Sequence, residues 1–201
     1  MKKLYLITGF LIISFFLTQI MYGQNEGTVY YPGDIKMQSN NTLGMEDFYK
    51  NPPDVSQCKE GFLKESEIQK VLDLVNYIRS LHDLPAVTYR YEDDPASAKA
   101  ALMMAAQGTI SHTPPSSFAC YTELGRSVTE KSNLHINMYG SPNPSNIASC
   151  ESGIRGWLFD NYSGNPEKVG HRRAIINPFL KYFSFGRCDG KPKASSQWPY
   201  V

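Results

Sequence analysis

The stretches Gly153-Ile-Arg-Gly-Trp157-Leu-Phe-Asp160-Asn161 and Gly170-His171-Arg-Arg-Ala-Ile-Ile-Asn-Pro178 decide how this chain is interpreted. They place an aromatic anchor, a carboxylate and an imidazole close together in the sequence. Ser111-His112 supplies a second imidazole at the expected end of a helix. Two histidines and a carboxylate are a minimal set for a divalent metal site, and also for general acid/base chemistry. The residue types alone do not choose between these uses and a structural role.

The N-terminus has the layout of a secretory signal peptide. Lys2 and Lys3 precede a mostly apolar run, Leu4–Ile20, and Gly23 offers a small residue for cleavage. We therefore expect residues 1–23 to be removed on export, which makes the protein secreted, periplasmic or extracellular. An uncleaved Leu4–Ile20 helix would instead anchor it in a membrane, because the run is near the lower length limit for a span.

Charge and length limit the classes of function. The chain has 20 basic and 19 acidic residues, for a net charge of +1. Loss of Lys2 and Lys3 would leave about −1, so charge-driven binding to nucleic acid or anionic membranes is not expected.

Residues 24–60 are rich in turn formers and are expected to be an N-terminal extension, laid on the domain or loosely ordered. Residues 61–201 are expected to form one domain.

The four cysteines are Cys58, Cys120, Cys150 and Cys188, with no Cys-x-x-Cys spacing, which excludes zinc-ribbon and thioredoxin-type motifs. In an exported protein this even number predicts two disulfides, with three pairings open. We expect Cys120–Cys150, closing the loop-rich middle, and Cys58–Cys188, tying the start of the domain to its last strand.

Hydrophobic periodicity predicts an α+β chain. Ser66 and Gln69 have the spacing of a capping box at the start of the first helix, and Gly108 is expected to end the alanine-rich second helix. Residues 113–152 are expected to be mostly loop. Helices are expected over 66–81, 94–107, 147–159 and 169–176, and strands over 86–91 and 179–187.

The order of the motifs resembles the CAP superfamily, also called the SCP domain, most closely in its bacterial form. Its members include cysteine-rich secretory proteins, insect antigen 5 and plant pathogenesis-related proteins. The resemblance covers roughly residues 66–190 and implies a three-layer α-β-α sandwich with an antiparallel sheet. The motifs are Asn76-x-x-Arg79, His82-Asp-Leu-Pro-Ala-Val-Thr88, Ser111-His112, Ser132-Asn133-Leu134, Trp157, Gly170-His171-Arg172 and Asn177-Pro178.

The resemblance implies a cleft built from two histidines and two acids. His112 and His171 match the histidines, and Asp160 occupies a position where many relatives have glutamate. Ser132, before Asn133, stands where the second glutamate is expected. The cleft candidates are therefore His112, Ser132, Asn133, Asp160 and His171. Aspartate is one methylene shorter and serine carries no charge, whereas metal–ligand distances tolerate only about ±0.2 Å. Both departures favour binding over catalysis, although Glu151 would compensate if a disulfide turned it inward.

Each cleft candidate also has a structural interpretation. His112 would interact with the carbonyls at a helix end, His171 would only hydrogen-bond Asp160, and Asp160 would simply end the Trp157 helix. Trp157 is more often a core anchor than a ligand platform. Asn76 and Arg79 are interpreted as structural residues of the first helix.

Three functions from different classes remain open, and no residue is assigned as catalytic. The first and favoured one is a secreted, non-enzymatic binding module whose cleft takes a lipid, glycan, protein or metal ligand. The second is a divalent-metal-dependent hydrolase, with His112, Asp160 and His171 holding zinc or another divalent cation. The third is a membrane-anchored surface protein with an uncleaved N-terminal helix. No nucleotide-cofactor motif is present.

Overall fold

A computed structural model of the chain describes residues 44–139, 147–161, 169–190 and 198–200. All of them belong to one compact unit, Thr42–Val201. The expected signal peptide, residues 1–23, lies outside the described residues, as does the first part of the expected extension, residues 24–43. Within the described part, no helix is long and apolar enough to cross a membrane.

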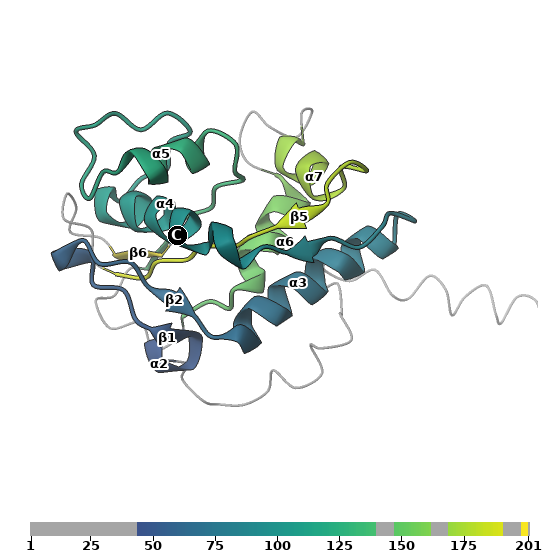
Figure 1. Cartoon of the computed structure of the whole chain (residues 1–201), viewed down its shortest axis with the longest axis horizontal. Coiled ribbons are helices and arrows are strands. Elements are labelled where there is room, and N and C mark those ends of the chain that lie inside the picture. The colour runs from purple at the N-terminus through teal and green to yellow at the C-terminus, as the bar shows by residue number, and fades with distance from the viewer. Residues whose placement is uncertain (1–43, 140–146, 162–168, 191–197, 201) are drawn as a thin grey trace, which may run out of the picture. The chain divides into compact units, whose positions relative to one another are not determined.

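Helices and short strand pairs make up the described residues, which confirms the α+β class (Figure 1). The helices are α2 (Met45–Phe48), α3 (Glu65–Ser80), α4 (Asp94–Gln107), α5 (Glu123–Thr129), α6 (Glu151–Phe159) and α7 (Gly170–Ile175). The strands are β1 (Tyr49–Asn51), β2 (Phe62–Leu63), β3 (Thr88–Tyr89), β4 (Asn137–Tyr139), β5 (Tyr182–Phe183) and β6 (Trp198–Tyr200). Helix α5 and strand β4 lie where the sequence predicted mostly loop.

The described strands form three separate pairs. The pairs β1–β2 and β4–β6 are antiparallel, whereas β3–β5 is parallel, with Thr88 opposite Tyr182. The parallel pair differs from the antiparallel sheet that was expected. It is possible because β3 and β5 are far apart in sequence, so that several helices make the long crossover a parallel pair requires.

Two long helices carry the apolar core. Helix α3 buries one stripe at helical spacing, but it begins after Lys64 with no side-chain cap, so the predicted capping box is absent. Helix α4 has proline in its first turn and ends at Gly108, whose φ of 75° only glycine adopts easily. The buried apolar residues of α3 are Ile68, Val71, Leu74, Val75 and Ile78.

The small residues of α4 allow neighbouring segments to approach closely. A Cβ atom added to Gly125 of α5 would lie 3.1 Å from the carbonyl carbon of Lys99 and 3.2 Å from the nitrogen of Ala100. A Cβ atom at Gly186 would lie 2.3 Å from the carbonyl oxygen of Ser97. Helix α4 therefore packs against α5 and against the segment after β5 at backbone distance. Helix α6 packs against α3 and α7.

Asn76 and Arg79 have the structural role that was expected. The Asn76 amide pairs with the backbone of Val87 through bonds of 2.8 and 3.1 Å, as a neighbouring strand would. Arg79 is fully buried, and its guanidinium donates to the carbonyls of Pro85, Ile175, Asn177 and Leu180. These bonds fix α3 to both segments that lead into the β3–β5 pair.

The disulfide prediction was wrong in both pairs. Cys58 is bonded to Cys120, with a Cα–Cα distance of 5.2 Å, while Cys150 and Cys188 are buried free thiols. Cys188 lies in the core among Val55 and the alanines of α4. Cys150 ends the turn before α6, where the Arg187 guanidinium is 3.5 Å from its sulfur. Tertiary packing decides which sulfur atoms meet, and the spacing of the cysteines in the sequence does not reveal that packing.

Residues 45–63 are part of the domain's framework. Tyr49 donates a hydrogen bond to the buried Asp189 carboxylate, and Arg187 lies over the Phe48 ring at 4.5 Å. The same segment carries Cys58 of the disulfide. The second half of the expected extension thus packs into the unit that begins at Thr42.

Candidate functional site

A cavity of about 100 Å³ lies between α4, the segment 128–135, α6 and the segment 184–187. Helix α4 contributes Ser97, Ala100, Ala101 and Met104, which share one helical face. Helix α6 contributes Gly153 and Trp157, which also share a face. The short side chains on these two faces leave the space that the cavity occupies.

The cavity wall combines apolar side chains with several polar ones. Trp157 is only 9% exposed, donates from its indole nitrogen to the Leu134 carbonyl at 3.1 Å, and meets the edge of Phe185. It is both the core anchor that was expected and part of the wall. Two cleft candidates, Ser132 and Asn133, also line the cavity. Small-molecule sites are likewise concave and combine apolar side chains with polar groups that fix the orientation of the ligand.

The other three cleft candidates do not line the cavity. Asp160 and His171 form a pair, with Asp160 fully buried and its Oδ1 2.7 Å from His171 Nδ1. The second carboxylate oxygen accepts from the backbone nitrogen of Arg172 at 3.2 Å. Burial opposes ionisation of Asp160, but the hydrogen bonds from His171 and Arg172 outweigh it and hold the pKa of this carboxyl below its ordinary value. This pair joins α6 to α7.

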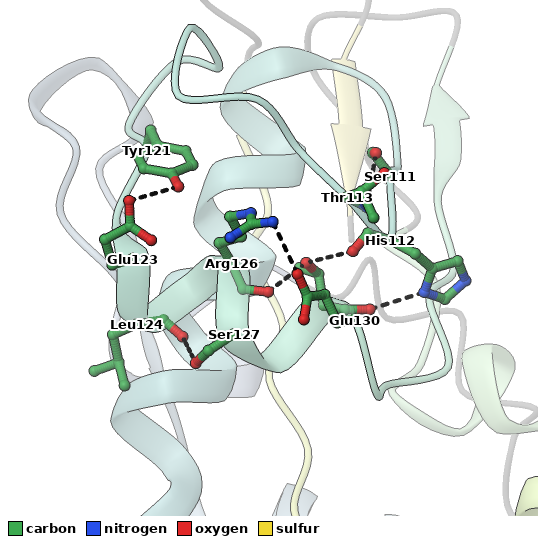
Figure 2. Close-up of polar contacts among 10 residues, drawn as sticks. Ser111, His112, Thr113, Tyr121, Glu123, Leu124, Arg126, Ser127 and Glu130 are labelled. Carbon is green, nitrogen blue, oxygen red and sulfur yellow. Dashed lines mark hydrogen bonds and ion pairs between the residues drawn. The ribbon is translucent and has the colours of Figure 1, made fainter.

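His112 makes its hydrogen bonds at the end of α5. Its Nδ1 donates to the carbonyl of Thr129 at 2.8 Å, and the Thr129 hydroxyl is 3.3 Å from the His112 carbonyl oxygen (Figure 2). The imidazole is exposed, and Figure 2 shows it on the far side of Glu130 from Arg126, with which Glu130 forms an ion pair. His112 thus bonds a carbonyl at the end of α5, and not one at the end of the preceding helix α4, which was the helix end suggested by the sequence.

Asn133 connects the cavity to the Asp160–His171 pair. Its amide nitrogen donates to the backbone carbonyl of His171 at 3.0 Å, while its side chain borders the cavity. Ser132 donates its hydroxyl to the carbonyl of Val128 at 2.8 Å. Ser132 thus contributes to the wall and to the end of α5, and it carries no charge toward His171.

His135 is the imidazole that the sequence argument missed. It lines the cavity, its Nε2 accepts from the Asn137 amide at 2.9 Å, and a Cβ on Gly153 would lie 3.8 Å from its ring. Burial, and the nearby charge of His171, lower its pKa below the ordinary value. Its position directly after Ser132-Asn133-Leu134 was the available signal, because all four of these consecutive residues line the cavity.

The tentative metal set is not gathered into one site. Within the described ranges, no group of three or more His, Cys, Asp or Glu side chains is placed to hold a metal ion. His112 donates to a carbonyl, and the Asp160 carboxylate is occupied by His171 and Arg172. Glu151 does not replace an acid there, since it lies close enough to Lys70 of α3 for their charges to interact. We derive no metal chemistry from these residues.

Arg172 covers the end of α6. Its guanidinium donates to the carbonyls of Leu158 and Phe159, so it satisfies groups that a helix C-terminus leaves without partners. Together with the Asp160 contacts, this fixes the angle at which α7 meets α6.

Comparisons with known proteins identify the family that the order of the motifs resembles. The family model described as the cysteine-rich secretory protein family, CAP, matches residues 72–197. An extracellular SCP-domain protein from Bacillus anthracis str. Ames is 20% identical over 68% of this chain and 40% of its own length, with a TM-score of 0.36. An outer surface protein from Borrelia burgdorferi is 15% identical over 68% of this chain and 89% of its own, with a TM-score of 0.37. These TM-scores are too low for a comparison of sites. A search of curated proteins found no match.

Proposed function

Because this chain belongs to the cysteine-rich secretory protein (CAP) family, we propose that it is an exported binding module whose ligand occupies the cavity beside Trp157. The cavity carries this proposal. It combines an apolar wall with Ser132 and Asn133, the two positions where the family resemblance placed part of the cleft. A short apolar group of a ligand would gain burial there, and the polar groups would orient it.

The histidines and the acid of the expected cleft favour binding over catalysis, because they already make structural hydrogen bonds. Asp160 and His171 join α6 to α7, and His112 holds the end of α5. A general base needs a lone pair aimed at the reacting proton. On the cavity wall only His135 supplies an imidazole, and its Nε2 lone pair is directed at Asn137.

Binding in the cavity is tested with xenon and short alcohols on protein labelled with ¹³C at methyl groups. We expect the methyl signals of Met104, Val128 and Leu134, which line the cavity, to shift on addition of either probe. Val71 of α3, which is buried elsewhere, serves as the control within the same spectrum. Equal shifts at Val71 and Leu134, or no shift at any wall residue, would contradict the proposal.

Export is tested separately. If the leader is cleaved after Gly23, the protein recovered outside the cytoplasm begins at Gln24. A chain that retains Leu4–Ile20 in the membrane fraction would favour the anchored alternative. Zinc analysis of protein purified without chelator addresses the hydrolase alternative. We expect far less than stoichiometric zinc, and stoichiometric zinc lost in both His112→Ala and His171→Ala would overturn the choice of binding over hydrolysis.

A further inference from the structure

Among the residues that the structure describes, three ionisable ones line the cavity: His135, Cys150 and Arg187. They come from three separate segments, and each could in principle present a charge to a ligand. Their surroundings decide whether it does. The selectivity of the cavity for charged or uncharged ligands therefore follows from the partners of these three groups.

Arg187 is neutralised within the protein. Its guanidinium forms two hydrogen bonds with the Asp189 carboxylate, at 2.7 and 2.9 Å, and a third with the carbonyl of Ala148 at 2.7 Å. Arg187 and Asp189 are only 2% and 6% exposed. Because both partners of this bidentate ion pair are buried, their charges cancel and little net charge remains on the cavity wall.

His135 and Cys150 are uncharged at neutral pH. Burial is the main cause in both, since it lowers the pKa of His135 and raises the pKa of Cys150 to about 11. The Asn137 amide donates to Nε2 of His135, which places the proton of the neutral ring on Nδ1. Neither group supplies a counter-charge to an ion.

From this arrangement we propose that the cavity binds a small uncharged ligand carrying one hydrogen-bonding oxygen, such as a short branched alcohol or amide, and rejects charged ligands of the same shape. The inference rests on the proposed function and narrows it to a ligand class. A carboxylate or ammonium group would lose its hydration against wall residues that, within the described part of the chain, offer it no free opposite charge, and that loss is large.

A pair of hydroxyls supplies the oxygen's partner. Ser97 and Ser184 lie on the wall with their hydroxyl oxygens 3.1 Å apart, so one hydroxyl donates to the other. The hydrogen of the accepting hydroxyl remains for a ligand oxygen. The volume of about 100 Å³ guides the size of the probe, because a cavity of about 150 Å³ holds benzene in other proteins. A branched four-carbon group is therefore the size we expect.

The test uses four probes of one shape at neutral pH: isobutanol, isobutyramide, isobutyrate and isobutylammonium. Methyl signals of Met104, Val128 and Leu134 in the wild-type protein report occupancy. We expect saturable shifts with the two neutral probes and none with the two ions at tenfold higher concentration. If the ions bind as well as the alcohol, the ligand class is wrong but the cavity remains a binding site. If no probe binds, the proposed function fails together with the inference.

Two variants locate the binding. Gly153→Ala puts a methyl group at the cavity edge, where its Cβ meets only the His135 ring at 3.8 Å, and should weaken isobutanol binding. Gly170→Ala is the matched control, because a Cβ there meets nothing within 4 Å and the residue does not line the cavity. Ser184→Ala should weaken isobutanol binding about five- to tenfold and leave xenon binding unchanged, as expected for one lost hydrogen bond. Equal losses for isobutanol and xenon would overturn the role of the hydroxyl pair.

Discussion

Replacement of Gly186 by alanine tests the packing that shapes the cavity. A Cβ atom at this position would lie 2.3 Å from the carbonyl oxygen of Ser97 and 2.9 Å from the nitrogen of Ala98. These are backbone atoms of helix α4, so no side-chain rotation can relieve the overlap. The segment 184–187 must move away from α4, which separates the Ser97 and Ser184 hydroxyls and disturbs the Arg187–Asp189 pair.

The cost follows from this geometry. Overpacking of a filled site costs about 1–3 kcal/mol, and contact with rigid backbone places Gly186→Ala at about 2–3 kcal/mol of unfolding free energy. With a urea m-value of about 2 kcal/mol/M, the midpoint of urea unfolding should fall by about 1 M. Gly170→Ala, a helical glycine with open space, should keep or raise the midpoint. Equal midpoints for the two variants would refute the close approach of Gly186 to α4.

Three further predictions concern buried groups. Native protein should show no fast-reacting thiol, because Cys150 and Cys188 are buried and their pKa values are raised. Unreduced protein in denaturant should show two reactive thiols, and a count of zero in denaturant would mean that a second disulfide is present. Arg79→Met should lower the unfolding free energy by about 2–4 kcal/mol, because the buried carbonyl of Ile175 and three partly buried carbonyls lose their donor. A loss under 1 kcal/mol in urea unfolding would contradict that role. Asp160→Asn should lower the unfolding free energy most at neutral pH. The lowered pKa of Asp160 adds stability above its unfolded pKa of about 3.9, and this stability is lost as the pH falls through the folded pKa. A difference in unfolding free energy between variant and wild type that widens in acid would contradict this prediction.

The sequence located the long elements because their signals are local. Apolar spacing placed α3, and Asp94-Pro95 with Gly108 placed α4 within one residue at either end. Helix α5 was missed because its seven residues carry only Leu124 and Val128 as large apolar groups. Its start was nevertheless signalled by Thr122, whose hydroxyl accepts from the nitrogen of Gly125 at 3.0 Å.

The site was harder to predict than the fold, because it depends on distances between segments. Ser132 and Asn133 were placed on a cleft wall by motif order, and the cavity contains both. His135 was passed over because nothing in its local sequence shows that Gly153 leaves room for its ring. The pairing of Cys58 with Cys120 likewise depends on contacts between segments that are 62 residues apart.

The aspartate at position 160 is explained better by backbone geometry than by metal chemistry. Asp160 ends α6 with φ 51° and ψ 36°, a left-handed conformation that aspartate adopts more readily than glutamate because its short side chain bonds locally. From that position its two oxygens reach His171 Nδ1 and the Arg172 nitrogen at the start of α7. A glutamate would carry its carboxylate one methylene further out and give up the left-handed preference. The residue that looked like a shortened metal ligand is thus suited to joining two helices.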